Sequence, residues 1–129
     1  MANLTPTLLV AGGIFNLCFA VFHLCFWRLF RWKEDLASLT PLNRAVMQIL
    51  NLCLTFVFLL MAYVSLRHGA ELPTTPLGRT LLGGFALFWF LRLIEQLAFF
   101  DASKPRSLAF MLAFFIGGLL YTLPLVLGA

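Results

Sequence analysis

The sequence has very little charge. Of its 129 residues, nine are Lys or Arg and five are Asp or Glu, so 11% of the chain is charged, against about 25% in a typical soluble domain. A soluble domain of this size needs charged side chains to cover its surface, and these are too few. The composition therefore excludes a soluble enzyme, a nucleic-acid-binding protein and a disordered regulator.

Metal and redox motifs are also missing. Cys18, Cys25 and Cys53 form no CxxC pair, and no Cys/His spacing is that of a metal site. The pattern predicts no metal and no other cofactor, and we expect the cysteines to be small buried apolar residues. His23 lies in an apolar run while His68 lies in a connection, so the two are too far apart in depth to hold a haem together.

Apolar residues dominate instead, at 62% of the chain with a mean hydropathy of +0.98. A helix that crosses a bilayer needs about 20 apolar residues, and four runs meet this length. We expect one transmembrane domain over residues 1–129, of the all-α class, folded as an antiparallel four-helix bundle. The expected helices cover about residues 6–30, 41–66, 76–100 and 105–127.

The starts of these helices carry recognisable signals. Thr5-Pro6, Thr40-Pro41 and Thr75-Pro76 each place a capping hydroxyl before a proline, which is the residue that best tolerates the first helical position. Lys104-Pro105 is a looser version of the same pattern. The connections between the runs are short, which predicts that successive helices are antiparallel neighbours.

Basic residues predict the orientation of the bundle. The first and third connections with their flanks carry six of them, whereas the opposite face carries only Arg67 and Arg79. Cytoplasmic loops are enriched in Lys and Arg, so both termini are expected outside the cytoplasm, in a multi-pass protein of the cell membrane such as a bacterial inner membrane. The six residues are Arg28, Arg31, Lys33, Arg44, Lys104 and Arg106.

Polar side chains within three of the runs are the best functional signal. Such residues are costly in hydrocarbon and mark functional sites by default. Their spacings of three, four or seven place those of each run on one helix face, and their depths indicate the cytoplasmic half. We expect a buried network around an Arg92–Glu95 ion pair. The candidate site residues are Asn16, His23, Arg44, Gln48, Asn51, Arg92, Glu95 and Gln96.

Three glycine pairs lie in the opposite, outer half of the runs. Gly12-Gly13, Gly83-Gly84 and Gly117-Gly118 would let the helices approach closely there. The bundle is then pinched near the outer face, and any cavity opens toward the cytoplasmic leaflet. Fifteen phenylalanines fit either a lipid-facing surface or an aromatic site for a sterol-, quinone- or lipid-like ligand.

Several functions fit this pattern. The preferred hypothesis is a protein without catalytic activity that binds the lipid bilayer and either a lipid-like or small ligand or a membrane partner subunit. A second is a proton-coupled transporter acting as a homo-oligomer, in which Glu95 and His23 carry protons and Arg92 attracts an anion. A third is an enzyme acting on a lipid or quinone, with Glu95 or His23 as acid or base. A further alternative is that the polar network has only a structural role and holds the helices together.

Overall fold

The computed structural model describes residues 4–128, which contain four long helices. Three short helical elements lie between the first and the second long helix. Within the described residues there is no strand, and four helices are long and apolar enough to cross a membrane. The elements are α1 (Leu4–Leu24), α2 (Phe26–Leu29), α3 (Trp32–Asp35), the 3-10 helix η1 (Leu36–Ser38), α4 (Pro41–Arg67), α5 (Pro76–Phe99) and α6 (Pro105–Leu127). The all-helical class and the four candidate spans are thereby confirmed.

Two of the predicted helix starts are confirmed in atomic detail. Thr40 Oγ1 accepts a hydrogen bond from the backbone N–H of Asn43 at 3.3 Å, and Thr75 Oγ1 accepts one from Gly78 at 3.0 Å. The start predicted at Thr5 is wrong, because α1 is already helical at Leu4. Pro6 then falls within the first turn, where no backbone N–H has a helical partner to lose.

The first helix is shorter than the predicted 6–30. α1 ends at Leu24, where the N–H of Cys25 is shared between the carbonyls of Val21 and Phe22 at 3.2 and 3.1 Å. After α2, Arg31 adopts a left-handed backbone conformation with φ of 51°, which turns the chain sharply. The turn directs the following segment back onto the bundle instead of extending the helix.

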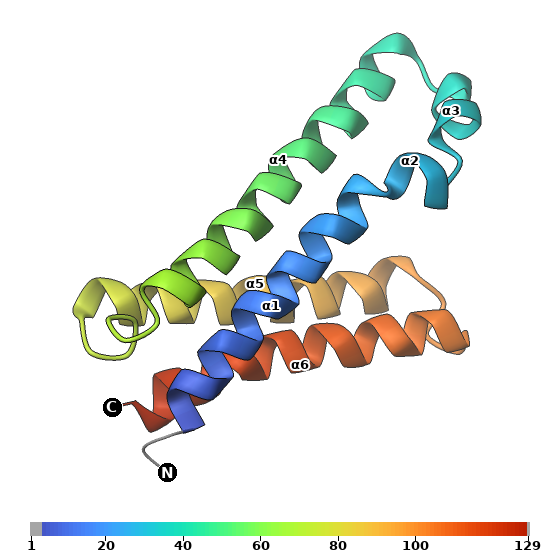
Figure 1. Cartoon of the computed structure of the whole chain (residues 1–129). Coiled ribbons are helices and arrows are strands. Elements are labelled where there is room, and N and C mark those ends of the chain that lie inside the picture. Colours follow the sequence, from blue (N-terminus) through green and yellow to red (C-terminus); the bar gives the residue numbers. More distant parts are fainter. Residues whose placement is uncertain (1–3, 129) are drawn as a thin grey trace.

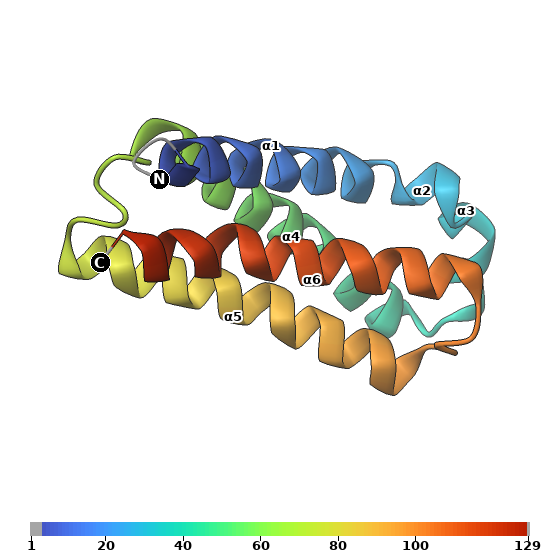
Figure 2. The ribbon, with the colours of Figure 1, turned by 90° about the horizontal axis from the view of Figure 1, so that it is seen from below.

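The long helices form two pairs. α1 packs along α4, α5 packs along α6, and the pairs meet mainly through α1 and α6. Figures 1 and 2 show both chain ends and residues 68–75 at one end of the molecule. Residues 25–40 and 100–104 lie at the other end, where the pairs diverge. We call these the 68–75 end and the 25–40 end.

Consecutive helices were expected to be close neighbours, but α4 and α5 do not pack along each other within the described residues. Large aromatic rings separate their backbones. Phe58 of α4 stacks on Trp89 of α5 with ring centroids 5.4 Å apart, and it meets Phe88 edge to face at 5.7 Å. Side chains of this size fill the space that a close helix contact would need.

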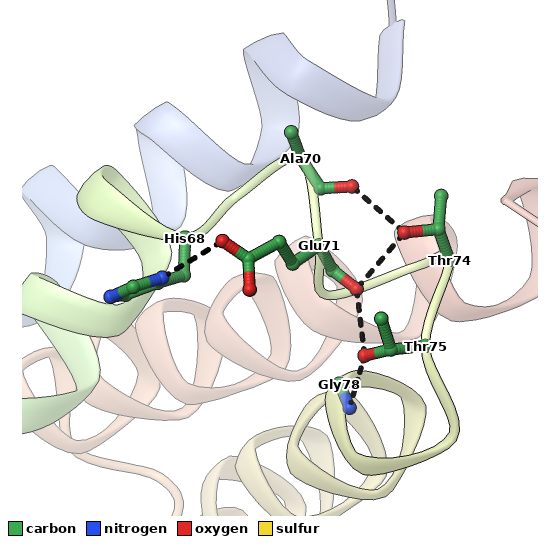
Figure 3. A network of polar contacts seen from close by, with 6 residues as sticks. All are labelled: His68, Ala70, Glu71, Thr74, Thr75 and Gly78. Carbon is green, nitrogen blue, oxygen red and sulfur yellow. Dashed lines mark hydrogen bonds and ion pairs between the residues drawn. The ribbon is translucent and has the colours of Figure 1, made fainter.

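The turn between α4 and α5 is fixed by a local set of hydrogen bonds (Figure 3). The backbone carbonyl of Glu71 accepts from the hydroxyls of Thr74 at 3.2 Å and Thr75 at 3.0 Å. The Glu71 carboxylate pairs with His68 Nδ1 at 3.1 Å. His68 is therefore a turn residue at the 68–75 end, whereas His23 lies in the last turn of α1, next to the 25–40 end.

Two glycine pairs allow close contact between helices, as predicted. A Cβ at Gly12 would lie 2.9 Å from the Tyr121 ring, and one at Gly118 would lie 2.5 Å from the Phe90 ring. The third pair differs: a Cβ at Gly83 would meet its nearest neighbour at 3.9 Å, and Gly84 has nothing within 4 Å. The tight packing is thus built by α1 and α6, while on α5 Gly83 has room for a Cβ and Gly84 faces open space.

These contacts predict opposite outcomes for two alanine substitutions. A Cβ at Gly117 would lie 2.8 Å from Phe15 and 2.9 Å from the fully buried Trp89. We expect Gly117→Ala to lower the free energy of unfolding by about 1–3 kcal/mol, as overpacking does. Gly84→Ala is expected to be neutral or to stabilise by up to about 1 kcal/mol, because alanine is the better helix former. Chemical unfolding in detergent, followed by circular dichroism, measures both. Equal effects would contradict the assigned helix contacts.

The cysteines do not lie where the sequence suggested. Cys18, Cys25 and Cys53 are unpaired and exposed, so the expectation that they are buried is wrong. Cys18 and Cys53 lie on the outer surfaces of α1 and α4, and Cys25 lies between α1 and α2. A small apolar side chain is as suitable on a surface that spanning helices would present to lipid as in a core.

Candidate ligand cavity

A cavity of about 940 Å³ lies between the two helix pairs at the 25–40 end. All four long helices contribute to its wall, and so do the short elements between α1 and α4. This is the end at which the glycine pattern predicted an opening. The volume lies at the upper limit of the roughly 300–1,000 Å³ that binding sites for drug-sized molecules occupy.

The inner wall of the cavity is aromatic. Trp89 is fully buried, and the rings of Phe19, Phe58 and Phe114 surround it with centroid distances of 4.8, 5.4 and 5.8 Å. All four residues line the cavity. Such a surface suits an acyl chain or another apolar group, and it offers few hydrogen bonds.

The outer part of the cavity carries charge. Lys104, Arg106, Asp35 and Asp101 line it, and Lys104 Nζ lies 4.0 Å from the Asp101 carboxylate. Hydrogen bonds from the hydroxyl and the backbone N–H of Ser103 lower the pKa of Asp101, so its carboxylate is ionised at neutral pH. Arg106 has no ion pair among the described residues. The mouth is therefore polar and the interior apolar.

Arg92 lies between these two regions. Its Nη2 donates to Gln96 Oε1 at 3.3 Å, and Gln96 Nε2 donates to the hydroxyl of Ser107 on α6 at 3.0 Å. The Glu95 carboxylate is 3.7 Å from Nη1, and the guanidinium lies 4.6 Å from the centre of the Phe114 ring. The predicted ion pair is thus present, but it is long and half exposed. Most of the five N–H groups of Arg92 have no hydrogen-bond partner within residues 4–128.

His23 and Asn51 form a second polar pair that joins α1 to α4. Asn51 Nδ2 donates to the backbone carbonyl of His23 at 3.0 Å, and Asn51 Oδ1 lies 2.8 Å from His23 Nδ1. Because Asn51 Nδ2 is the donor to the His23 carbonyl, the atom that faces the ring is the amide oxygen, which can only accept. The proton of this hydrogen bond is therefore on His23 Nδ1. In the neutral ring the lone pair is therefore on Nε2. His23 lines the cavity and stacks on Phe26 at 4.2 Å.

The eight candidate residues do not form one network. His23, Arg92 and Gln96 line the cavity, whereas the other five do not. Asn16 belongs to a separate cluster nearer the 68–75 end, where its Nδ2 donates to Tyr121 Oη at 2.7 Å and that hydroxyl lies 2.8 Å from Ser65 Oγ. Asn16 shares a helix face with His23, which is why the sequence places it in the predicted network. It lies two turns further along α1 toward the 68–75 end, and this distance separates it from the cavity residues.

Arg44 and Gln48 have structural contacts in place of the predicted ones. Arg44 donates to the carbonyls of Leu36, Ala37 and Leu39 at 2.9, 3.2 and 3.3 Å, and Gln48 Nε2 donates to the Arg44 carbonyl at 3.1 Å. Arg44 thereby holds the segment that carries the buried Leu36. Arg44 does not line the cavity itself but holds residues 36–39, of which Leu36 and Leu39 form part of the cavity wall.

Sequence reasoning missed the contributions of α6 and of the segment before α4. Ser107 binds Gln96, and Tyr121 binds both Asn16 and Ser65. A serine or tyrosine in an apolar run is too common to be singled out by pattern. Trp32 and Leu36 are 6% and 3% exposed and line the cavity, although their segment was expected to be a connection.

No cluster of three metal-binding side chains occurs among residues 4–128. No family model, curated protein or solved structure matches this chain. The arrangement of the cavity is therefore the basis for a functional assignment.

Proposed function

We propose that this protein is a multi-pass membrane protein that binds an amphipathic, lipid-like molecule between its two helix pairs. The observation that carries the proposal is the cavity of about 940 Å³, with aromatic rings inside and charged residues at its mouth. A molecule with an apolar chain and a polar end matches this division. A soluble polar metabolite would leave the aromatic wall without a partner, and a purely apolar one would leave most of the N–H groups of Arg92 without an acceptor.

The proposed orientation places the 25–40 end in the cytoplasm and both termini on the other side, with the four spans arranged as an antiparallel bundle. Arg28, Arg31, Lys33 and Lys104 all belong to the connections at the 25–40 end, as the enrichment of basic residues in cytoplasmic loops requires. The cavity mouth then lies at the level of the cytoplasmic lipid head groups, from which an amphiphile can enter with its chain first.

Trp89 provides a direct test, because its ring forms part of the cavity wall. In a Trp27→Phe/Trp32→Phe background it is the sole tryptophan. The protein in dodecyl maltoside is titrated with lysophosphatidylcholine that carries a 9,10-dibromostearoyl chain, whose bromines quench tryptophan at short range. We expect saturable quenching of Trp89 that excess unbrominated stearoyl lysophosphatidylcholine reverses.

The matched control keeps Trp27, whose side chain is exposed, and carries Trp32→Phe and Trp89→Phe. Quenching of Trp27 should rise in proportion to the brominated lipid in the micelle and should not saturate. If Trp89 behaves in the same way as Trp27, the lipid only mixes with the micelle and the cavity does not bind it.

A further inference from the structure

Two polar residues with different hydrogen-bonding requirements line the cavity from opposite helix pairs. Arg92 of α5 has N–H donors and a positive charge, whereas the neutral ring of His23 on α1 has its lone pair on Nε2, and both residues line the cavity. From this juxtaposition we propose that the bound amphiphile has an anionic head group that also carries a hydroxyl, as in phosphatidylglycerol. This inference rests on the proposed function and specifies the head group for that same cavity.

The anionic part follows from the surroundings of Arg92. Its hydrogen bond to Gln96 uses one N–H, and the Glu95 carboxylate at 3.7 Å is beyond hydrogen-bond distance. Arg92 is seven residues before the end of α5, or about 10 Å along the helix. A guanidinium at this depth favours a phosphate or carboxylate that accepts two of its N–H groups at once. The positive charges of Lys104 and Arg106 at the mouth are matched in number by the carboxylates of Asp35 and Asp101, so Arg92 is the group that favours an anion.

The hydroxyl follows from the tautomer of His23. Asn51 fixes the proton on Nδ1, so Nε2 of the neutral ring can accept a hydrogen bond but cannot donate one. Phosphate, carboxylate and ketone oxygens are acceptors, and none of them satisfies it. A head group with an O–H donor does. The ring is held by Asn51 on α4 and by stacking on Phe26 at 4.2 Å, so its orientation is set before the ligand binds.

Three diacyl lipids separate the two requirements. Dioleoyl phosphatidylglycerol has the charge and the hydroxyls, dioleoyl phosphatidylmethanol has the charge alone, and dioleoyl phosphatidylcholine has neither a net charge nor a hydroxyl. Titrations followed by native mass spectrometry give the dissociation constant of each from the wild-type protein. We expect phosphatidylmethanol to bind about 10- to 100-fold more tightly than phosphatidylcholine, because both phosphates can accept hydrogen bonds from Arg92 but the choline ammonium offsets the negative charge only in phosphatidylcholine. Phosphatidylglycerol should gain a further factor of about 3–10 from the bond to His23.

Single substitutions should remove these preferences one at a time. Arg92→Gln should abolish the preference for the two anionic lipids, whereas Arg67→Gln at the 68–75 end should leave it unchanged. His23→Phe keeps a ring against Phe26 and should abolish the difference between phosphatidylglycerol and phosphatidylmethanol. His68→Phe in the distant turn is its matched control. If Arg92→Gln does not fold, Arg92→Lys retains the charge and should keep part of the anionic preference.

The wild-type protein alone can overturn the proposal. Equal dissociation constants for the three lipids would refute the head-group assignment while leaving the binding of a lipid-like molecule intact. Failure of all three to bind, together with unsaturable quenching of Trp89, would refute the proposed function itself. Glycerol 3-phosphate tests the soluble source of the same chemistry, and binding as tight as that of phosphatidylglycerol would refute a lipid ligand.

Discussion

Replacing Trp89 by alanine is expected to lower the free energy of unfolding by about 3–5 kcal/mol, the range for a buried tryptophan or phenylalanine. Trp89 is fully buried and contacts rings from three other helices: Phe19 of α1, Phe58 of α4 and Phe114 of α6. α4 and α5 share no extended backbone packing, so this ring cluster is the principal link between them. Unfolding in detergent, monitored by circular dichroism, measures the loss.

Trp89→Phe separates packing from hydrogen bonding at this position. The indole Nε1 is buried and has no hydrogen-bond partner among the described residues, so removing it costs no hydrogen bond. We expect Trp89→Phe to destabilise by no more than about 1.5 kcal/mol, since a ring remains in place. A loss as large as that of Trp89→Ala would show that Nε1 is bonded and that the ring cluster is not the source of the stability.

Arg44→Met is expected to release the outer wall of the cavity. Arg44 donates to three carbonyls of residues 36–39, and hydrogen bonds to a charged group contribute about 1.5–3 kcal/mol each to stability. Loss of even one of these contributions would raise local opening of the segment about 10- to 100-fold. Hydrogen–deuterium exchange of the peptide covering residues 32–40 measures this effect. Quenching of Trp89 by the brominated lipid should weaken in parallel, because Trp32 and Leu36 line the cavity.

Two variants calibrate this result. Arg44→Lys keeps the charge but loses the planar set of donors, so it should fall between wild type and Arg44→Met. Arg79→Met, in the first turns of α5 near the 68–75 end, removes a charge without touching the segment and should leave its exchange unchanged. Unaltered exchange in Arg44→Met would show that packing of Trp32 and Leu36 alone fixes the wall.

The long helices could be predicted because their signals are local. Four apolar runs of sufficient length, together with threonine caps before Pro41 and Pro76, determine where most spans lie. The end of α1 at Leu24 could not be predicted, because the residues that follow remain apolar and helix-compatible. The break depends on the left-handed turn at Arg31 and on burial of Trp32 and Leu36, which are tertiary effects.

The candidate site was predicted in part. Spacing on one helix identified Arg92, Glu95 and Gln96 as neighbours, and they are. Spacing cannot tell which helices pair, and the predicted network required polar residues of α4 and α5 to meet. Asn51 instead binds His23 on α1, and Gln96 binds Ser107 on α6. Both of these bonds therefore lie between helices that pack directly, while the aromatic cluster occupies the space between α4 and α5.

The glycine contacts of α6 also have a mechanical consequence. Gly117 and Gly118 bring α6 against Phe15 of α1 and the rings of α5. α6 begins twelve residues before Gly117, at Pro105, between the cavity residues Lys104 and Arg106. That distance is about 18 Å along a helix. A rotation of one helix pair by about 5° around the glycines would move the start of α6 by about 1.5 Å at this distance. The close contacts at the glycines would be the pivot of such a rotation. A slight tilt would then change the width of the cavity entrance, while the tightly packed end would hardly move.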